Sequence, residues 1–302
     1  MEEYLIIDAH SHLWLTQDTE VDGQPIHSLE SNPSRSLFFG EERQMLPPFM
    51  IDGRNTAEVF LSNMDYAQVS SAVVVQEIID GNQNSYLRQV ESRYPARFLC
   101  CGMPQSFPQD CTPEELSSLS DFKAIAIPAH RYTRSLFTLL PLFKSMEGRG
   151  QILSICLSDD ASQIAEMLEI IRECPMLKIA IGHFGMVTRP HWEEQVKLAA
   201  NKNVMIESGG ITWLYNDEFY PYPSAMKAIR HAADLVGMDK LMWGSDYPRT
   251  ITAITYRMSY DFIIKSSLLT TAEKRLFLGE NALRFYGFQN PQRLPYIKNM
   301  SE

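Results

Sequence analysis

The chain has 302 residues, 45% of them hydrophobic and 21% charged, which is the composition of a globular protein with a sizeable core. Its formal net charge of −10 and its pI of about 5.3 argue against binding to nucleic acids or anionic membranes, which require basic surfaces. The acidic start Met1-Glu2-Glu3, the lack of any apolar run near the roughly 18 residues of a membrane span, and five cysteines without a CxxC pair predict a cytosolic protein.

Short apolar and β-branched runs recur along the chain between stretches of helical periodicity. From the second run to the seventh they begin at residues 72, 98, 124, 152, 178 and 204, and each step has room for one strand, one helix and two loops. The predicted strands are Leu5–Ala9, Ala72–Gln76, Phe98–Gly102, Ala124–Pro128, Ile152–Leu157, Lys178–Gly182, Val204–Glu207 and Leu241–Gly244. The predicted helices are Thr56–Ala67, Asn84–Tyr94, Leu136–Gly148, Ser162–Glu173, Trp192–Asn201 and Ser224–Val236. Repeated βα units in one chain predict a single-domain (β/α)8 barrel of the TIM type over residues 1–302, in preference to a doubly wound open sheet.

One segment departs from this repeat. Residues 16–54 are polar, contain glycine and proline, and are too many for an ordinary loop between a strand and a helix. In a barrel they would lie over the mouth, so we expect a long loop that is either a lid or an ordered surface insertion. Residues 289–302 are expected to form a C-terminal tail.

Polar residues follow three of the predicted strands at the end where barrel enzymes carry their active sites. His10 and His12 end the first strand and, two residues apart, should project from the same face. His183 follows the sixth strand and Asp246 the eighth. Each alone has a plain structural explanation, such as a packed histidine or a helix N-cap. Together at one face of a barrel they indicate an active site.

These motifs resemble those of a known superfamily. The run Ile6-Ile-Asp-Ala-His-Ser-His12, the histidine of His183-Phe-Gly185 and the aspartate of Gly244-Ser-Asp-Tyr-Pro248 together resemble the amidohydrolase superfamily and, more narrowly, its amidohydrolase-2 branch. That branch includes sugar lactonases, pyrone-dicarboxylate lactonase, and zinc-dependent decarboxylases and hydratases of aromatic or unsaturated acids. The likeness spans most of the chain, since Val73–Gln76 resembles the second strand of the branch and Asn281–Tyr286 its closing helix.

The chain departs from this pattern at the fifth strand. Many relatives place a metal-binding histidine at its end, where this chain has Cys156. A thiolate can ligate zinc, although a buried inert cysteine is the plainer interpretation. Lys123 begins the fourth strand instead of ending it, so a bridging lysine and a two-metal site are not expected. The remaining candidate ligands are His10, His12 and Asp246, which could bind one divalent metal ion, most readily zinc. Alternatively, the three residues could act without a metal, as the resemblance to metal-independent lactonases implies.

Basic residues are grouped in the predicted mouth loops of this acidic protein. His130, Arg131 and Arg134 follow the fourth strand, Arg189 follows the sixth, and Arg249 follows the eighth. Each residue alone could be an ordinary solvated surface charge. A group of arginines, however, is typical of a carboxylate-binding site, because a guanidinium group pairs with a carboxylate through two hydrogen bonds. We therefore expect a small-molecule substrate that is anionic or polyhydroxylated. The aromatic residues that could stack on such a substrate are Trp14, Tyr132, Trp213 and Tyr215.

The interpretation that fits these residues best is hydrolysis of a lactone, or less readily an amide, of a small sugar acid or carboxylic acid. In it, partial burial suits Asp246 to act as general base on a water molecule. His10 and His12, or a metal they hold, polarise the carbonyl, and His183 stabilises the oxyanion.

Two other functions stay open. One is a zinc-dependent decarboxylase or hydratase of an aromatic or unsaturated carboxylic acid, which requires a tightly held metal. The other is a catalytically silent binding protein on the same fold, against which the four intact site residues argue. The sequence fixes neither the substrate nor the oligomeric state, and a homo-oligomer is one alternative.

Overall fold

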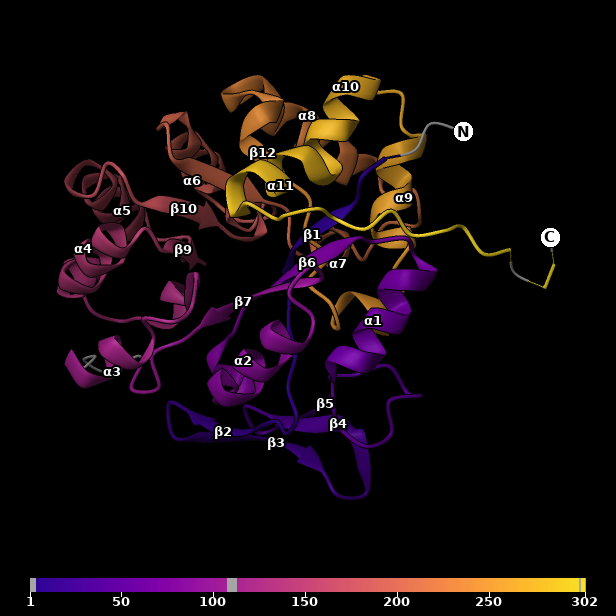
Figure 1. The fold of residues 1–302 in the computed structure, drawn as a ribbon, viewed down its shortest axis with the longest axis horizontal. Coiled ribbons are helices and arrows are strands. Elements are labelled where there is room, and N and C mark those ends of the chain that lie inside the picture. The colour runs from indigo at the N-terminus through magenta and orange to yellow at the C-terminus, as the bar shows by residue number, and fades with distance from the viewer. Residues whose placement is uncertain (1–3, 108–112, 299, 302) are drawn as a thin grey trace.

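A computed structural model describes residues 4–107, 113–298 and 300–301. Its main sheet has eight parallel strands in the order in which they occur along the chain (Figure 1). These strands are β1 Ile7–Ser11, β6 Ser71–Val74, β7 Phe98–Gly102, β8 Ala124–Ile127, β9 Ile152–Ile155, β10 Lys178–Ile181, β11 Val204–Glu207 and β12 Leu241–Met242. All eight predicted strands are found, each within two residues at either end.

The first and last strands meet and close the sheet. The Ala9 amide donates to the Trp243 carbonyl at 2.9 Å, and the Asp246 amide donates to the His10 carbonyl at 2.9 Å. A (β/α)8 barrel is therefore confirmed. Because closure joins β1 to β12, the segments that carry His10 and Asp246 are held side by side by their own backbones.

Helices alternate with the strands and cover the outside of the barrel (Figure 1). They are α1 Ala57–Tyr66, α2 Asn84–Arg93, α3 Pro113–Ser118, α4 Leu140–Arg149, α5 Ala161–Glu173, α6 Trp192–Lys197, α7 Ile211–Leu214, α8 Pro223–Val236, α9 Met258–Lys265, α10 Thr271–Arg275 and α11 Asn281–Tyr286. The six predicted helices correspond to α1, α2, α4, α5, α6 and α8. Helix α5 begins one residue earlier than predicted because Asp160 caps it, its side chain accepting from the Ser162 amide at 2.9 Å. None of the described helices is long and apolar enough to cross a membrane.

Two large clusters make up most of the hydrophobic core of the described residues. Side chains that point into the barrel, such as Ile7, Val73, Leu99 and Ile152, form one cluster, which Tyr286 of the closing helix also joins. The larger cluster lies between the strands and the helices. The barrel is therefore filled below the site, which leaves the carboxyl ends of the strands as the place for a cavity.

Residues 16–54 contain an antiparallel sheet of four strands, where the sequence predicts a loop. The strands are β2 Asp18–Val21, β3 Gln24–Leu29, β4 Asn32–Phe38 and β5 Glu41–Gln44, seen at the lower edge of Figure 1. Two of the turns, Asp22-Gly23 and Phe39-Gly40, have both residues at positive φ, which is the geometry of tight hairpins. The prediction that this segment acts as a lid stays a prediction. The described residues of the expected tail, 289–302, contain no helix or strand.

Candidate active site

His10 and His12 lie together at the carboxyl end of β1. Their Nε2 atoms are 3.2 Å apart, as the spacing of two residues in a strand predicts. Each ring is held from behind by a buried carboxylate. His10 Nδ1 is 2.6 Å from Glu207, the last residue of β11, and His12 Nδ1 is 2.8 Å from Asp80. The two Nε2 atoms are thereby turned toward each other.

Asp246 completes this group from the segment after β12. Its backbone has a φ of 59°, a left-handed conformation that is unusual for a residue other than glycine and that often marks functional sites. Its Oδ1 atom lies 3.2 Å from His12 Nε2 and 3.6 Å from His10 Nε2. Its Oδ2 atom accepts a hydrogen bond from the indole of Trp213 at 2.6 Å. The carboxylate is therefore fixed on both sides.

The three donor atoms of His10, His12 and Asp246 fit one zinc ion. Ligands about 2.0–2.1 Å from a tetrahedral ion lie about 3.3–3.4 Å from one another, and the observed separations are 3.2, 3.2 and 3.6 Å. Without a cation, only one proton can occupy the contact between the two Nε2 atoms, whereas an ion uses both lone pairs. The donor set is thus suited to a divalent metal with an open coordination position.

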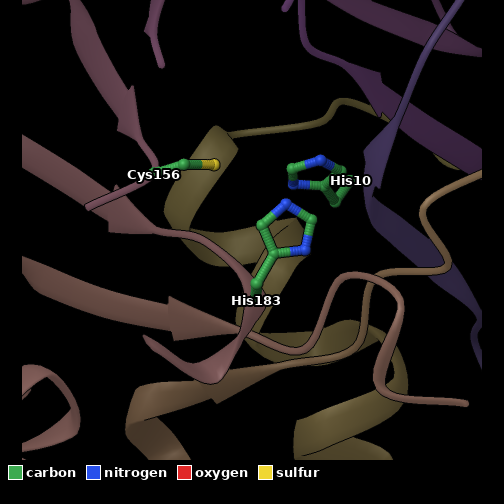
Figure 2. Close-up of side chains that lie close together, drawn as sticks. All are labelled: His10, Cys156 and His183. Carbon is green, nitrogen blue, oxygen red and sulfur yellow. The ribbon is translucent and has the colours of Figure 1, made fainter. Parts of the chain in front are cut away.

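His183 and Cys156 lie beside His10. Cys156 follows β9 and His183 follows β10, and both point toward the His10 ring (Figure 2). One ligand atom from each of the three residues lies within 4.8 Å of the others. The His183 backbone is left-handed, with a φ of 56°. Its Nδ1 is 2.7 Å from the Gly209 carbonyl, which can only accept, so Nδ1 carries the proton and Nε2 offers a lone pair.

The charges of these groups depend on their buried neighbours. Burial lowers the pKa of His183, and the adjacent His10 lowers it further, so His183 is neutral near pH 7. Burial also opposes the charged forms of His10 and His12. It is outweighed at His10 mainly by Glu207 and at His12 by Asp80 together with Asp246, so both histidine pKa values are raised.

The expectation that burial makes Asp246 more basic is wrong. Burial does act in that direction, but hydrogen bonding from His12 and the charges of the neighbouring histidines outweigh it. The pKa of Asp246 therefore lies well below its ordinary value. The Cys156 thiol shows the opposite behaviour, because burial and nearby carboxylates raise its pKa well above the ordinary value. In the absence of a metal it is a neutral thiol.

These residues form the floor of a cavity of about 670 Å³, a volume suited to a small organic molecule. The mouth is lined in part by the inserted sheet, through Phe38, Arg43, Gln44 and the following Met45. Of the aromatic residues predicted to stack on a substrate, Trp14 and Trp213 line the cavity, whereas Tyr132 and Tyr215 do not.

The predicted basic residues are divided between the cavity and its surroundings. His130, Arg131, Arg189 and Arg249 line the cavity, but Arg134 does not, and its guanidinium instead lies 5.2 Å from the Tyr132 ring. Burial and the neighbouring Arg131 lower the pKa of His130 to about 4, so this side chain carries no positive charge near pH 7.

The cavity arginines differ in how their charge is matched. Arg131 pairs with both carboxylate oxygens of Glu77. Arg249 stacks on Trp213, with the guanidinium carbon 3.8 Å from the ring centroid. Within the described part of the chain, neither Arg189 nor Arg249 pairs with a carboxylate. These two are the arginines whose charge is available to a ligand.

Comparison with known families decides the relationship that the motifs suggest. The amidohydrolase family model (Amidohydro_2) matches residues 7–288, nearly the whole chain. The chain belongs to the amidohydrolase family. Among curated proteins, none matches it.

Solved structures of several other proteins share this fold. A probable 2-pyrone-4,6-dicarboxylic acid hydrolase from Acinetobacter baumannii, with citric acid bound, is 21% identical with a TM-score of 0.68, covering 94% of this chain and 99% of that one. A zinc-bound amidohydrolase from Burkholderia multivorans is 15% identical with a TM-score of 0.69, at the same coverage. A 5-carboxyvanillate decarboxylase from Novosphingobium aromaticivorans, with manganese and a nitrobenzoic acid, is 19% identical with a TM-score of 0.61, covering 94% and 96%. At these identities the likeness establishes the fold.

Three residues of this amidohydrolase site, Glu207, Asp80 and Glu77, were not expected from its sequence, and Trp213 was expected only as a residue that stacks on the substrate. Glu207 holds His10, Asp80 holds His12, Glu77 pairs with Arg131, and Trp213 contacts Asp246. Glu207 carried a usable signal, because it is a charged residue at the carboxyl end of a predicted buried strand. Glu77 and Asp80 lie between β6 and α2, at the start and the end of the short 3₁₀ helix Ile78–Asp80, and the sequence does not specify the path of this segment.

Proposed function

We propose that this amidohydrolase opens the ring ester of a lactone that carries carboxylate or hydroxyl groups, using an activated water molecule. The observation that carries the proposal is the composition of one cavity. Its floor holds His10, His12, His183 and Asp246, and its mouth holds Arg189 and Arg249, which have no carboxylate partner among the residues that the structure describes. A probable pyrone-dicarboxylate hydrolase among the structural neighbours supports the same substrate class.

The hydrogen bonds of the site favour His183 as the group that takes the proton of water. Its Nε2 lone pair accepts no hydrogen bond from the described residues, and the ring is neutral. Both oxygens of Asp246 already accept hydrogen bonds, from His12 and Trp213, and its basicity is low. We therefore transfer the role of base from Asp246 to His183. This also replaces the expected oxyanion role of His183, because an unprotonated Nε2 cannot donate.

His10, His12 and Asp246 then act on the carbonyl of the substrate. Glu207 and Asp80 favour positive charge at the histidine pair, which polarises a carbonyl oxygen placed against it. One zinc ion held by His10, His12 and Asp246 would supply Lewis-acid polarisation at the same place. After water attacks, the proton held on His183 Nε2 passes to the leaving ring oxygen, which completes hydrolysis.

A second candidate is decarboxylation of an aromatic carboxylic acid. The observation in its favour is the fit of the three donor atoms to a metal, since manganese is bound in a decarboxylase of the same fold. The same arginines would then bind the carboxylates of that acid.

We also place the protein in the cytoplasm, in keeping with its unpaired Cys100, Cys101, Cys156 and Cys174.

The test combines metal analysis with a substrate screen. The purified protein is dialysed against a chelator, its zinc content is measured, and it is assayed with carboxylated lactones and with aromatic carboxylic acids, before and after zinc is restored. We expect ring opening, followed as proton release at constant pH, and easy loss of zinc, because the fifth strand supplies a cysteine in place of histidine. Release of carbon dioxide without ring opening, with one equivalent of zinc retained and required, would replace the lactonase by the decarboxylase.

A further inference from the structure

Trp213 contacts both halves of the cavity. It lies in α7, the short helix after β11, and lines the cavity wall. Its indole N–H donates to Asp246 Oδ2 at 2.6 Å, while one face of its ring carries the Arg249 guanidinium at 3.8 Å. Its ring also meets that of His183 edge-on, with the centroids 6.0 Å apart. One side chain thus touches the floor and the mouth of the site.

The local sequence is adapted to this position. Gly210 precedes α7 with a φ of +68°, and a Cβ added to it would lie 1.7 Å from Trp213 Nε1. Only glycine therefore lets the indole fold back over the chain toward Asp246. The adjacent Gly209 carbonyl is the group that holds His183. The turn 209–210 consequently positions two side chains of the site at once.

The hydrogen bond from Trp213 orients the carboxylate of Asp246. The last torsion of an aspartate is broad, so the carboxylate plane is not fixed by its own rotamer. With Oδ2 held by the indole, Oδ1 is directed at His10 and His12, where the three donor atoms converge. Partners that orient ligands in this way commonly decide how tightly a metal is bound.

The ring of Trp213 restrains the guanidinium group of Arg249. Arg249 is exposed and pairs with no carboxylate in the described chain, so only the face of Trp213 restrains its guanidinium beside the cavity. An aromatic face attracts a cation without neutralising its charge, which leaves the charge available to an anionic ligand.

We propose that Trp213 is a positioning residue that joins the two halves of the site, fixing Asp246 as a metal ligand through its N–H and holding Arg249 for the substrate anion through its ring. The proposal deepens the proposed function and rests on it for the identity of that anion. It predicts that the two contacts can be separated. Trp213→Phe keeps an aromatic face and removes the N–H, whereas Trp213→Leu removes both.

The first experiment measures zinc affinity by competition with a chromophoric chelator. Trp213→Phe should bind zinc about 10- to 100-fold more weakly than wild type, the usual cost of losing a partner that orients a ligand. Trp192→Phe is the matched control, because Trp192 lies on α6 beside His231, outside the cavity, and its affinity should equal that of wild type. Gly210→Ala, which displaces the indole without changing it, should weaken zinc binding as Trp213→Phe does, and serves as the second variant if the first does not fold.

The second experiment measures citrate binding by calorimetry on metal-free protein, since citrate also binds zinc in solution. Trp213→Phe should change the citrate affinity by less than about threefold, because a ring face remains for Arg249. Trp213→Leu should weaken citrate binding by about 2- to 30-fold, the range of a cation–π contact. Arg249→Met should weaken it at least as much.

A double-mutant cycle separates positioning from general damage. In the Asp246→Asn background, Trp213→Phe should have little further effect on zinc affinity, because the ligand it positions has already been changed. Equal effects of Trp213→Phe in both backgrounds, unchanged zinc affinity in Trp213→Phe, or a wild type that takes up no zinc would each overturn the proposal. Zinc and citrate binding as expected without any lactone hydrolysis would overturn the proposed function alone.

Discussion

At the floor of the cavity each charged side chain is buried or mostly buried and bonded to a buried partner, whereas at the mouth Arg189 and Arg249 are exposed and pair with no carboxylate in the described chain. The pairs His10–Glu207 and His12–Asp80 span 2.6 and 2.8 Å, and each carboxylate is buried. The floor residues come from strand ends, whose positions the barrel fixes. The mouth residues come from loops and from the inserted sheet.

This difference assigns different tasks to the two regions. Groups that take part in bond breaking have to be held within tenths of an ångström, which buried hydrogen-bonded pairs achieve. Groups that recognise a ligand have to keep part of their charge unmatched until the ligand arrives. Substitutions at the floor should therefore affect turnover and metal binding, and substitutions at the mouth should affect KM.

Replacing the floor carboxylate itself should have the largest effect. Asp246→Asn keeps the shape of the side chain but removes the anion that His12 and His10 face. We expect kcat to fall by about 10²-fold or more. Asp159→Asn, an exposed carboxylate on the same cavity, is the control and should keep wild-type turnover. Near-normal turnover of Asp246→Asn, measured with the lactone found in the screen, would remove Asp246 from the chemistry.

Replacing a carboxylate behind the floor should have the next largest effect. The Glu207 carboxylate bonds to the Nδ1 atom of His10 and accepts a hydrogen bond from the backbone amide of His183 at 3.2 Å. It therefore fixes the positions of two site residues. Glu207→Gln should weaken zinc binding by about 10- to 100-fold, the range for groups that orient metal ligands.

The control for Glu207 is Glu193→Gln. Glu193 forms the same kind of pair with His231 at 3.0 Å, but on the surface, where such a pair contributes little. Equal zinc affinity in Glu207→Gln and wild type, measured by chelator competition, would reduce Glu207 to a packing role.

The same division explains what could be predicted from the sequence. The eight strands, and with them His10, His12, His183 and Asp246, follow from apolar runs and their spacing, because a barrel brings all strand ends to one face. Glu207 could have been found by the same argument, since it ends a predicted strand. Asp80 and the hydrogen bond of Trp213 to Asp246 could not, because they depend on loop paths and on a left-handed turn at Gly210.

The inserted sheet shows a missed local signal. Asp22-Gly23 is a dipeptide typical of tight hairpin turns, and it does join β2 to β3. The polar composition of residues 16–54 concealed it, because this sheet buries few side chains and every residue of β5 is exposed. The basicity of Asp246 was also misjudged, since a sequence indicates burial but not the histidines that surround a carboxylate.

At the mouth, the arginines should differ according to their partners. Arg249→Ala should raise KM for an anionic lactone by about tenfold, the lower end of the range for a charged hydrogen bond, because the residue is exposed. Arg134→Ala should leave KM unchanged, since Arg134 does not line the cavity. Equal KM values for neutral and anionic analogues in the wild type would rule out an anion site here.

The smallest effect is expected in the inserted sheet, and it tests whether that sheet is a lid. Arg43 of β5 lines the cavity, but it pairs with Glu41 at 2.7 Å and both side chains are more than half exposed. If the sheet only borders the cavity, Arg43→Ala removes an exposed ion pair worth about 0–1 kcal/mol and changes KM by less than about fivefold. The control is Arg35→Ala on the neighbouring β4, whose residue pairs with Glu42 and does not line the cavity. A rise in KM as large as that of Arg249→Ala, with Arg35→Ala unchanged, would show that Arg43 reaches the bound substrate. The sheet would then be part of the recognition surface and its role as a lid would be supported, because an exposed arginine gains that much only when a ligand and the sheet together exclude water from it.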